Sequence, residues 1–596
     1  MPVGGAYGYH STVKSKRLPP AAARRPVRIQ LTRQLARLLA AVLMLAVPMG
    51  SAQALGPAPR SSDLPTLGDT EREALSPLME RKLGEEIMND IRRDHDFLDD
   101  DPILEYLNNF GNALVDARPG ARGEANFDFY FFCVRDPQLN AFALPGGFIA
   151  VHSALLLAAQ SESELASVLG HEIGHVVQRH IARQLGKQRQ DALIPLAALI
   201  LAVLAAKAGG GGDFGMGVFA AGEGVAIQRQ LNFSRDAERE ADRIGFQIMS
   251  EAGFDTSGMV AFFQRMQTTM RNYSDFTPPW LQSHPLTSER IADIQARIRE
   301  QPYKQRLDSQ EFYLVRSRAR VLQDESSQGL VDATTFFENQ MQQQSRQQIA
   351  AAQYGLSFVA LKRGDWAAAQ SWLDKARATA DKPSPGTFSV ARAPVPSSIF
   401  TYSALEIELA QGKDPAVVKQ ALVDAEQAHV QFPLSRGIAR QYAEAMIAAS
   451  QSERAVQYLR DQVQLYKQEP ALYDLLAKAY SAQGKQALQH IALAESYALQ
   501  GGVLSALDQL AIGRKAPDAT FYEQAVIDAR ERELQARQRE IIGEKDKKDM
   551  QSSAFKVQMT SGTDKDKPAG ASHTISHLDS DPFRDVDALR KPAGNP

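Results

Sequence analysis

The sequence has little of three things. It has one cysteine, Cys133, in 596 residues, which excludes a disulfide within the chain and a zinc site built from thiolates; we expect this cysteine on a buried strand. The net charge is only −3, so no nucleic-acid partner is expected. The apolar runs 38–47 and 192–206 are both shorter than the roughly 20 residues that span a bilayer. What is present is 44% hydrophobic residues, enough for sizeable cores in several domains.

The N-terminus has the pattern of a secretory signal peptide. Arginines between Arg24 and Arg37 precede the apolar run 38–47, and small residues lead to Ala52-Gln53-Ala54, an A-x-A cleavage pattern. We therefore expect cleavage after Ala54 and export to the periplasm of a bacterium. A translation start downstream of Met1 and an uncleaved anchor are the alternatives.

His171 and His175 are four residues apart in a run, 161–186, that has helical periodicity. Residues at this spacing lie on one face of a helix, so both imidazoles can reach one metal ion. Glu172 follows the first histidine and is placed to act as a general base toward the attacking water. Gly174 is expected to leave the helix face beside the metal uncrowded. Ser161 with Glu164 is interpreted as a capping box.

A third ligand decides whether this motif is functional, because H-E-x-x-H also occurs by chance. One zinc-protease class takes a histidine after a glycine, but Gln178 stands at the glycine position and His180 falls one residue early. We interpret His180 as a polar histidine on the helix surface. Glu238 and Asp242 share a helical face: Glu238 would complete a site of two histidines and a carboxylate, and Asp242 would accept the ring N–H of a ligand histidine. The alternative is a charged, solvent-exposed helix.

In combination, His171-Glu-x-x-His175 and Glu238-x-x-Ala-Asp242 resemble the gluzincin metallopeptidases that include the HtpX proteases and the CAAX prenyl proteases. Three further segments match that family: 140–147, Ser234-Arg235, and His284-Pro285 with Arg290-Ile291. The resemblance extends from about residue 65 to the end of the helical repeats. It implies one zinc ion per chain, with His171, His175 and Glu238 as ligands and Glu172 and Asp242 in catalytic roles.

Two segments, 126–134 and 141–150, have the composition of strands. The second is interrupted by a Pro-Gly-Gly sequence, and proline confines a strand to the edge of a sheet, where an extended peptide can add as another strand. In the resembling family this stretch lies along the cleft. An ordinary hairpin is the alternative. The candidate substrate edge comprises Asn140, Ala141, Phe142, Ala143, Leu144, Pro145, Gly146 and Gly147.

His284 lies where a loop enters a helix, and three interpretations are open. It is a loop histidine bonded to backbone, a catalytic donor that stabilises the oxyanion, or a regulatory ligand that occupies the fourth position on zinc and displaces water. In the resembling family the His-Pro segment lies near the metal. We favour the regulatory interpretation, in which His284 is a latch.

Residues 192–206 and the glycine-rich stretch after them are interpreted as a hydrophobic hairpin or lid beside the active site that touches a membrane or an unfolded client; a buried helix is the alternative. Residues 310–534 are almost continuously helical in pattern, with tetratricopeptide-like marks such as Gly364 and Trp366. The tail is expected to be disordered. We thus expect a signal peptide at 1–54, a protease domain at 55–305, repeats at 306–540 and a tail at 541–596.

The predicted fold is an α+β zincin-type metalloprotease domain, mostly helical with a small sheet, followed by an all-α domain of tetratricopeptide-like repeats. The resemblance implies a zinc-dependent endopeptidase of the bacterial periplasm, associated with the outer membrane, that acts in outer-membrane protein quality control and assembly. Its expected partners are unfolded or stalled outer-membrane proteins and the outer-membrane barrel assembly machinery. One alternative is a chaperone-like scaffold in which proteolysis is secondary. Another is an integral-membrane protease of the HtpX kind, which the short apolar runs disfavour.

Overall fold

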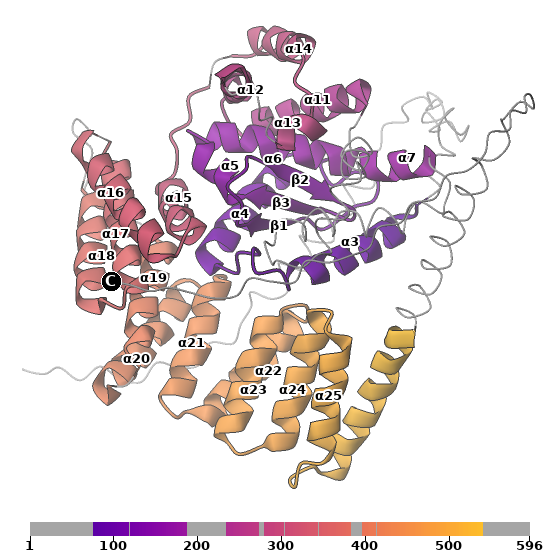
Figure 1. Ribbon diagram of the computed structural model, residues 1–596, viewed down its shortest axis with the longest axis vertical. Helices are drawn as coiled ribbons and strands as arrows, with labels where there is room; N and C mark the ends of the chain where they lie inside the picture. The colour runs from indigo at the N-terminus through magenta and orange to yellow at the C-terminus, as the bar shows by residue number, and fades with distance from the viewer. Residues whose placement is uncertain are drawn as a thin grey trace, which may run out of the picture. The chain divides into compact units, whose positions relative to one another are not determined.

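The computed structural model describes residues 75–118, 120–187, 234–272, 279–302, 304–343, 345–382, 396–412 and 414–539. The predicted signal peptide, the apolar run 192–206 and the predicted disordered tail lie outside these ranges. Within them, every helix is too short or too polar to cross a membrane. Figure 1 shows a small sheet among helices, followed in the chain by helices alone.

The sheet has three strands in the order β1-β3-β2: β1 is Tyr130–Val134, β2 is Ala141–Leu144 and β3 is Phe148–His152. The central strand β3 runs parallel to β1 and antiparallel to β2. The segment 141–150, predicted as one interrupted strand, is therefore a hairpin, which was the alternative prediction. Gly146 and Gly147 have φ angles of 79° and 93°, which side chains disfavour, so the chain turns there. Cys133 is buried in β1, as expected.

Several of the described helices before residue 300 pack against the sheet. The predicted helix 161–186 is two helices, because Arg179 between them has a φ of 50° and interrupts the helical path. The Ser161 hydroxyl caps the first of these by accepting the Glu164 N–H, but the Glu164 carboxylate accepts the N–H of Gln160, so the capping box is only half formed. The helices are α3 (Pro77–Ile91), α4 (Asp101–Asp116), α5 (Ser153–Ala158), α6 (Glu162–Val177), α7 (His180–Lys187), α11 (Arg235–Glu251), α12 (Ser257–Asn272), α13 (Pro279–Ser283) and α14 (Ser288–Arg299).

Helices α6 and α11 pack with their backbones close together. A Cβ atom added to Gly174 would lie 2.8 Å from the Ala241 carbonyl oxygen, and one added to Gly245 would lie 2.8 Å from the backbone of Gly170. Gly174 was expected to clear space beside a metal; its contact is with the backbone of α11 instead. This close approach brings the side chains of the two helices to one point.

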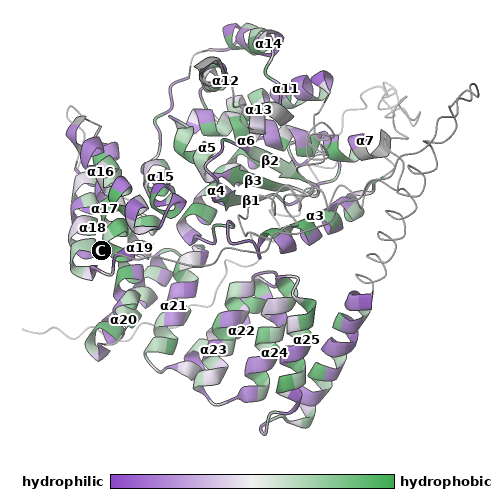
Figure 2. Ribbon diagram, in the orientation of Figure 1, coloured by the Kyte–Doolittle hydropathy of each residue, from purple (hydrophilic) through white to green (hydrophobic). Residues whose placement is uncertain are grey.

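The remaining helices follow one another along the chain, each packed against its neighbour, and Figure 2 shows hydrophobic and hydrophilic residues mixed along each of them. Residues 521–539 are also helical. The prediction of a mostly helical domain with a small sheet, followed by an all-helical region, is confirmed for the described residues. These helices are α15 (Gln310–Gln323), α16 (Ser327–Gln343), α17 (Arg346–Lys362), α18 (Trp366–Ala380), α19 (Ser398–Ala410), α20 (Pro415–Gln431), α21 (Arg436–Ala448), α22 (Ser452–Leu465), α23 (Pro470–Ala482), α24 (Gln486–Leu499) and α25 (Val503–Arg514).

The hydrophobic core runs past the predicted domain boundary at residue 305. One cluster of buried side chains extends from Leu98 to Ile407, so helices α15 to α19 share a core with the sheet. Arg318 on α15 is 2% exposed and forms ion pairs with Asp100, which caps α4, and with Glu406 on α19. The division into domains stays a prediction, and a cut at this boundary would open the shared core.

Candidate metal centre

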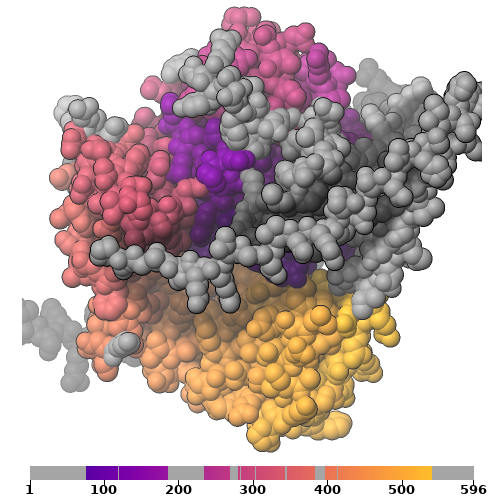
Figure 3. All heavy atoms as spheres, in the orientation of Figure 1, coloured from indigo at the N-terminus to yellow at the C-terminus, as the bar shows by residue number. Residues whose placement is uncertain are grey.

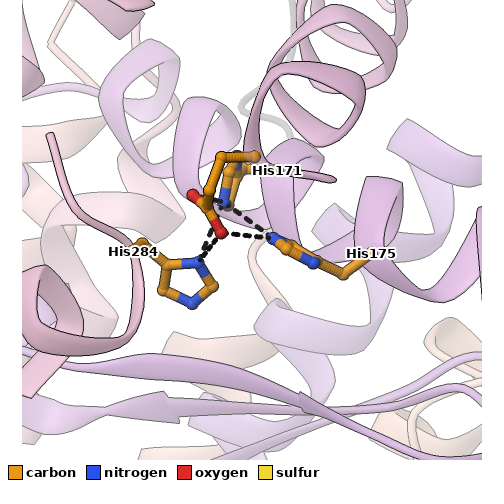
Figure 4. Close-up of side chains that lie close together, drawn as sticks. His171, His175 and His284 are labelled. Atoms are coloured by element: carbon orange, nitrogen blue, oxygen red, sulfur yellow. Dashed lines mark hydrogen bonds and ion pairs between the residues drawn. The ribbon is translucent and has the colours of Figure 1, made fainter. Parts of the chain in front are cut away.

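The two histidines of the H-E-x-x-H motif lie one turn apart on α6, and both are buried. Their Nε2 atoms face each other at 3.0 Å. Figure 4 shows their imidazoles converging with that of His284. Two ring nitrogens directed at a common point are the arrangement that would bind a metal ion once both nitrogens are unprotonated.

Glu238 brings a carboxylate to the same point from α11. The hydroxyl of Ser234 caps that helix by accepting the Ala237 N–H, which places Glu238 in the first turn. Its Oε2 lies 3.5 Å from His171 Nε2, and its Oε1 lies 3.5 Å from His175 Nε2. The structure therefore brings together the three residues that the sequence predicted as ligands.

His284 is the fourth member of the cluster. It follows α13 and is 2% exposed. Its Nδ1 lies 3.0 Å from Glu238 Oε1 and 3.3 Å from His171 Nε2. The potential ligand atoms of His171, His175, Glu238 and His284 all lie within 4.8 Å of one another. Of the three interpretations of His284, this position agrees with the two that place it beside the metal.

Asp242, one turn after Glu238, lies behind His171. The His171 Nδ1–H donates to Asp242 Oδ1 at 2.9 Å, since an ionised carboxylate can only accept. Arg290 on α14 donates from Nε and Nη2 to the two oxygens of Asp242 at 2.6 and 2.7 Å, and its Nη1 lies 2.9 Å from Glu238 Oε2. Sequence reasoning noted Arg290 only as part of the resemblance and missed that it holds both carboxylates.

The carboxylate of Glu172, the predicted general base, is 1% exposed. Its Oε1 accepts the indole N–H of Trp280 at 3.2 Å and lies 3.6 Å from His284 Nε2. Both of these neighbours come from α13 and the residue after it. Trp280 was not predicted as a site residue, because nothing in its local sequence pattern links it to α6, more than 100 residues earlier.

Burial and mutual charge move the pKa values of the cluster apart. Burial acts to lower the pKa of His171, but hydrogen bonds to Asp242 and Glu238 outweigh it and raise that pKa to about 9. Burial and the neighbouring His171 hold the pKa of His175 well below its ordinary value. Despite burial, His284 and His171 hold the pKa of Glu238 well below its usual range, so this carboxylate is ionised at neutral pH.

The interpretation of His180 as a surface histidine is wrong. Its side chain is buried, and its Nδ1 lies 2.9 Å from His175 Nδ1. Burial lowers the pKa of His180 to about 4, so its imidazole is neutral at pH 7. The break at Arg179 redirects the chain and turns this side chain inward.

The candidate substrate edge, residues 140–147, spans β2 and the turn that follows it. Strand β2 lies at one edge of the described sheet and packs against α6. The Asn140 carbonyl accepts the His152 N–H at 3.0 Å, and the Leu139 carbonyl accepts the Trp280 N–H at 3.4 Å. The predicted edge strand thus begins next to the helix that carries Trp280.

The sequence of the chain is similar to those of known metalloproteases. Residues 107–298 match Peptidase family M48. Over 498 residues, 84% of this chain and 96% of the relative, the chain is 28% identical to the beta-barrel assembly-enhancing protease of Escherichia coli strain K12. A Vibrio cholerae protein named a candidate beta-barrel assembly-enhancing protease is 38% identical over 256 residues, 43% of this chain and about half (51%) of that relative. The mitochondrial metalloendopeptidase OMA1 of Schizosaccharomyces pombe is 30% identical over 182 residues, 30% of this chain and 50% of the relative.

These similarities confirm the resemblance predicted from the sequence, which over its whole length pointed to the periplasmic beta-barrel assembly-enhancing protease. The chain contains an M48 peptidase domain and is a metalloprotease. The matched range includes all four members of the histidine–glutamate cluster, and the M48 family implies that a metal ion is the cofactor.

Proposed function

We propose that the metal is one zinc ion per chain, bound by His171, His175 and Glu238. Ligand atoms on a tetrahedral zinc ion at roughly 2.0–2.1 Å are roughly 3.3–3.4 Å apart. The corresponding nitrogen and oxygen atoms lie 3.0 to 3.5 Å apart here. The observation that carries the proposal is the convergence of these atoms next to Glu172. A zinc ion there would supply Lewis-acid activation of water and of the peptide carbonyl.

Glu172 is proposed as the general base, which accepts a proton from the attacking water and delivers it to the leaving amine. Its Oε1 accepts the Trp280 N–H, so the carboxylate is held in one orientation. Asp242 and Arg290 support the other side of the site. They fix the tautomer of His171 and the position of Glu238 through the hydrogen bonds and the ion pair described above, as partners of metal ligands commonly do.

His284 is proposed as a latch that takes the fourth ligand position and excludes water. Its Nδ1 is as close to Glu238 Oε1 as the two α6 histidines are to each other, 3.0 Å in both cases. The imidazole and Trp280 both belong to the segment around α13, so movement of that segment would remove the latch and release Glu172 together.

The latch is tested by His284→Ala, with zinc content and the cleavage of an unfolded protein as readouts. We expect retained zinc and faster basal cleavage, because the fourth position becomes accessible to water. A fall in activity of roughly 10²–10³-fold, the cost of a lost oxyanion donor, would instead identify His284 as catalytic.

The substrate is proposed to be an unfolded polypeptide that adds to the sheet edge at β2. A peptide bound there gains main-chain hydrogen bonds whatever its sequence, which suits clients that have lost their fold. A proline in the bound peptide has no N–H to donate. It would therefore be excluded from the peptide positions that pair with β2.

The clients are proposed to be unfolded or stalled outer-membrane proteins, met in the bacterial periplasm after export by the N-terminal signal peptide. The names of the similar bacterial proteins support a role in β-barrel assembly, and the assembly machinery of the outer membrane is the proposed partner of the repeats. Several large apolar side chains on the C-terminal helices and the turn after α20 are exposed and suit such contacts: Val430, Leu434, Leu465, Phe521 and Tyr522. Figure 3 shows the orange and yellow helices as one continuous surface.

The test is a Glu172→Gln variant produced in the cell envelope. This variant should retain one zinc ion and lose peptide hydrolysis, so that clients bound to it can be cross-linked and identified. Outer-membrane proteins among the captured species support the proposal; a variant that still cleaves casein contradicts the role of Glu172. A variant that fully restores outer-membrane assembly without cleavage would favour the alternative, a chaperone-like scaffold.

A further inference from the structure

Two polar side chains, His180 and then Glu240, lead outward from the proposed metal ligand His175. Its Nδ1 lies 2.9 Å from His180 Nδ1, and His180 Nε2 lies 3.1 Å from Glu240 Oε2 on α11. The two imidazoles meet edge to face, with ring centroids 4.8 Å apart. His180 is only 3% exposed, yet it is outside the group of side chains that converge as metal ligands.

The direction of the protons follows from the geometry. His175 Nε2 faces the other ligand atoms, at 3.0 Å from His171 Nε2. A neutral histidine that offers Nε2 to a metal carries its proton on Nδ1. That proton points at His180 Nδ1, which must then be an acceptor, so the proton of His180 is on Nε2 and points at Glu240. His175 therefore donates to His180, and His180 donates to Glu240.

The break between α6 and α7 makes this contact possible. Had α6 continued without a break, His180 would be about 140° around the helix from His175, since each residue turns the chain by about 100°. Arg179 instead adopts a φ of 50°, a left-handed conformation that costs a non-glycine residue roughly 1 kcal/mol or more. Its guanidinium is held by Glu80, with Nε 3.1 Å from Oε2, and by the Leu75 carbonyl. This turn starts α7 at His180 with its ring directed back at His175.

We propose that His180, oriented by Glu240, is a positioning residue for the metal ligand His175. It would fix the tautomer and the ring angle of His175, as Asp242 does for His171. The two α6 histidines would then have different supports: a buried carboxylate behind His171, and a neutral imidazole linked to a partly exposed carboxylate behind His175. The inference rests on the proposed zinc site and adds residues that the ligand motif does not include.

The test measures zinc dissociation constants of the full chain by competition with a chromophoric chelator. His180→Phe keeps a planar ring but removes the acceptor, and we expect zinc binding to weaken by roughly 10–100-fold, as for other lost partners of metal ligands. His180→Asn places an amide oxygen near the former Nδ1 and should recover most of that loss. Cobalt-substituted protein adds a spectroscopic readout: its visible bands should shift in the Phe variant and return in the Asn variant.

Two matched controls separate positioning from packing. His152→Phe removes another buried histidine, which lies 3.5 Å from Asp136 and outside the ligand cluster; it should lower Tm without changing zinc affinity. Arg183→Gln removes the other partner of Glu240, at 2.7 Å, and should leave zinc affinity unchanged, whereas Glu240→Ala should weaken it by less than His180→Phe does.

The outcomes distinguish the two levels of proposal. If the wild-type chain binds no zinc, the proposed function fails. If the wild type binds one zinc ion and His180→Phe binds it with the same dissociation constant, only the role of His180 is refuted. The role is equally refuted if the Asn variant loses as much affinity as the Phe variant at equal Tm.

Discussion

The contact between α6 and α11 and the contacts among the C-terminal helices α20 to α24 are filled by different kinds of residue. Between α6 and α11, glycine removes side chains from the contact, and the buried residues of α11 include two carboxylates, Glu238 and Asp242, beside apolar ones. In the cluster formed by α20 to α24, alanine, leucine and tyrosine fill the contact, and the buried members are apolar. The first contact thus brings ionised side chains into the interior next to an apolar core, whereas the second is filled mainly by apolar side chains.

The largest contrast is expected from removing a central side chain in each region. His171→Ala should lose the metal and all measurable hydrolysis while the fold remains, because one of the three proposed zinc ligands is removed. Leu459→Ala in α22, where the side chain is fully buried, should lower the free energy of unfolding by about 2–5 kcal/mol with one metal ion still bound. Metal analysis and denaturant unfolding measure the two effects. Full zinc occupancy in the His171 variant would contradict the ligand assignment.

Adding a methyl group at the α6–α11 contact should weaken metal binding, whereas removing one from α21 should leave metal binding unchanged. Gly174→Ala would place a Cβ 2.8 Å from the Ala241 carbonyl oxygen, so the helices must separate, at a cost of about 1–3 kcal/mol and with weaker metal binding. In α21, Ala443 is buried, and Ala443→Gly should cost about 1 kcal/mol with metal binding unchanged. Thermal unfolding with and without zinc separates these cases. Equal zinc affinity in the wild type and the Gly174 variant would show that the close approach does not position the ligands.

Asp242→Asn tests the polar interior of the first region alone. The amide keeps the shape of the carboxylate but loses its charge, and both His171 and Arg290 point donors at it. Zinc should still bind, with an affinity lower by roughly 10–100-fold. The comparison variant is Asp293→Asn, since Asp293 contacts arginines at the surface of the same domain. An unchanged dissociation constant for Asp242→Asn would show that Asp242 does not support the metal ligand His171.

The smallest effect is expected from two buried carboxyl groups, one in each part of the molecule, whose pKa values are both raised. Burial raises the pKa of Glu80 to about 7 against the opposing Arg179, and burial followed by Asp424 raises that of Glu408 to about 7. Each protonated carboxyl therefore stabilises the fold at low pH, and this contribution is lost as the pH rises from about 4.5 through about 7. Glu80→Gln and Glu408→Gln should each reduce the fall in unfolding free energy over that interval. A steeper fall in either variant would contradict the sign of the shift.

How much the sequence could predict also differs between the regions. The C-terminal helices were predictable because their buried residues recur at helical spacing and contact neighbours in the chain. The convergence of the proposed ligands His171, His175 and Glu238 was predictable because the spacing within each motif indicates a shared helix face. His180 was not, because the break at Arg179 contradicts the helical periodicity on both sides of it.

Trp280, Arg290 and the hairpin illustrate a second limit. Trp280 and Arg290 reach the site from α13 and α14, and no spacing within those helices indicates a partner on α6 or α11. The stretch 141–150 was predicted as one strand interrupted by Pro145-Gly146-Gly147, although Gly146 and Gly147 together permit a reversal of the chain. Local sequence pattern thus indicated the proposed ligands, whereas the side chains that contact them are apparent only from the tertiary structure.

The start of α4 has a mechanical consequence. Two of the three consecutive aspartates there are attached to different helices: Asp100 to Arg318 on α15, and Asp101 to Arg440 on α21, with a 3.0 Å bond from Nε. Further along α4, the Asn108 amide bonds both the carbonyl and the N–H of Phe131 in β1. A load applied to α21, such as a partner pulling on the repeats, therefore has a stiff path through one helix to the sheet whose opposite edge is β2.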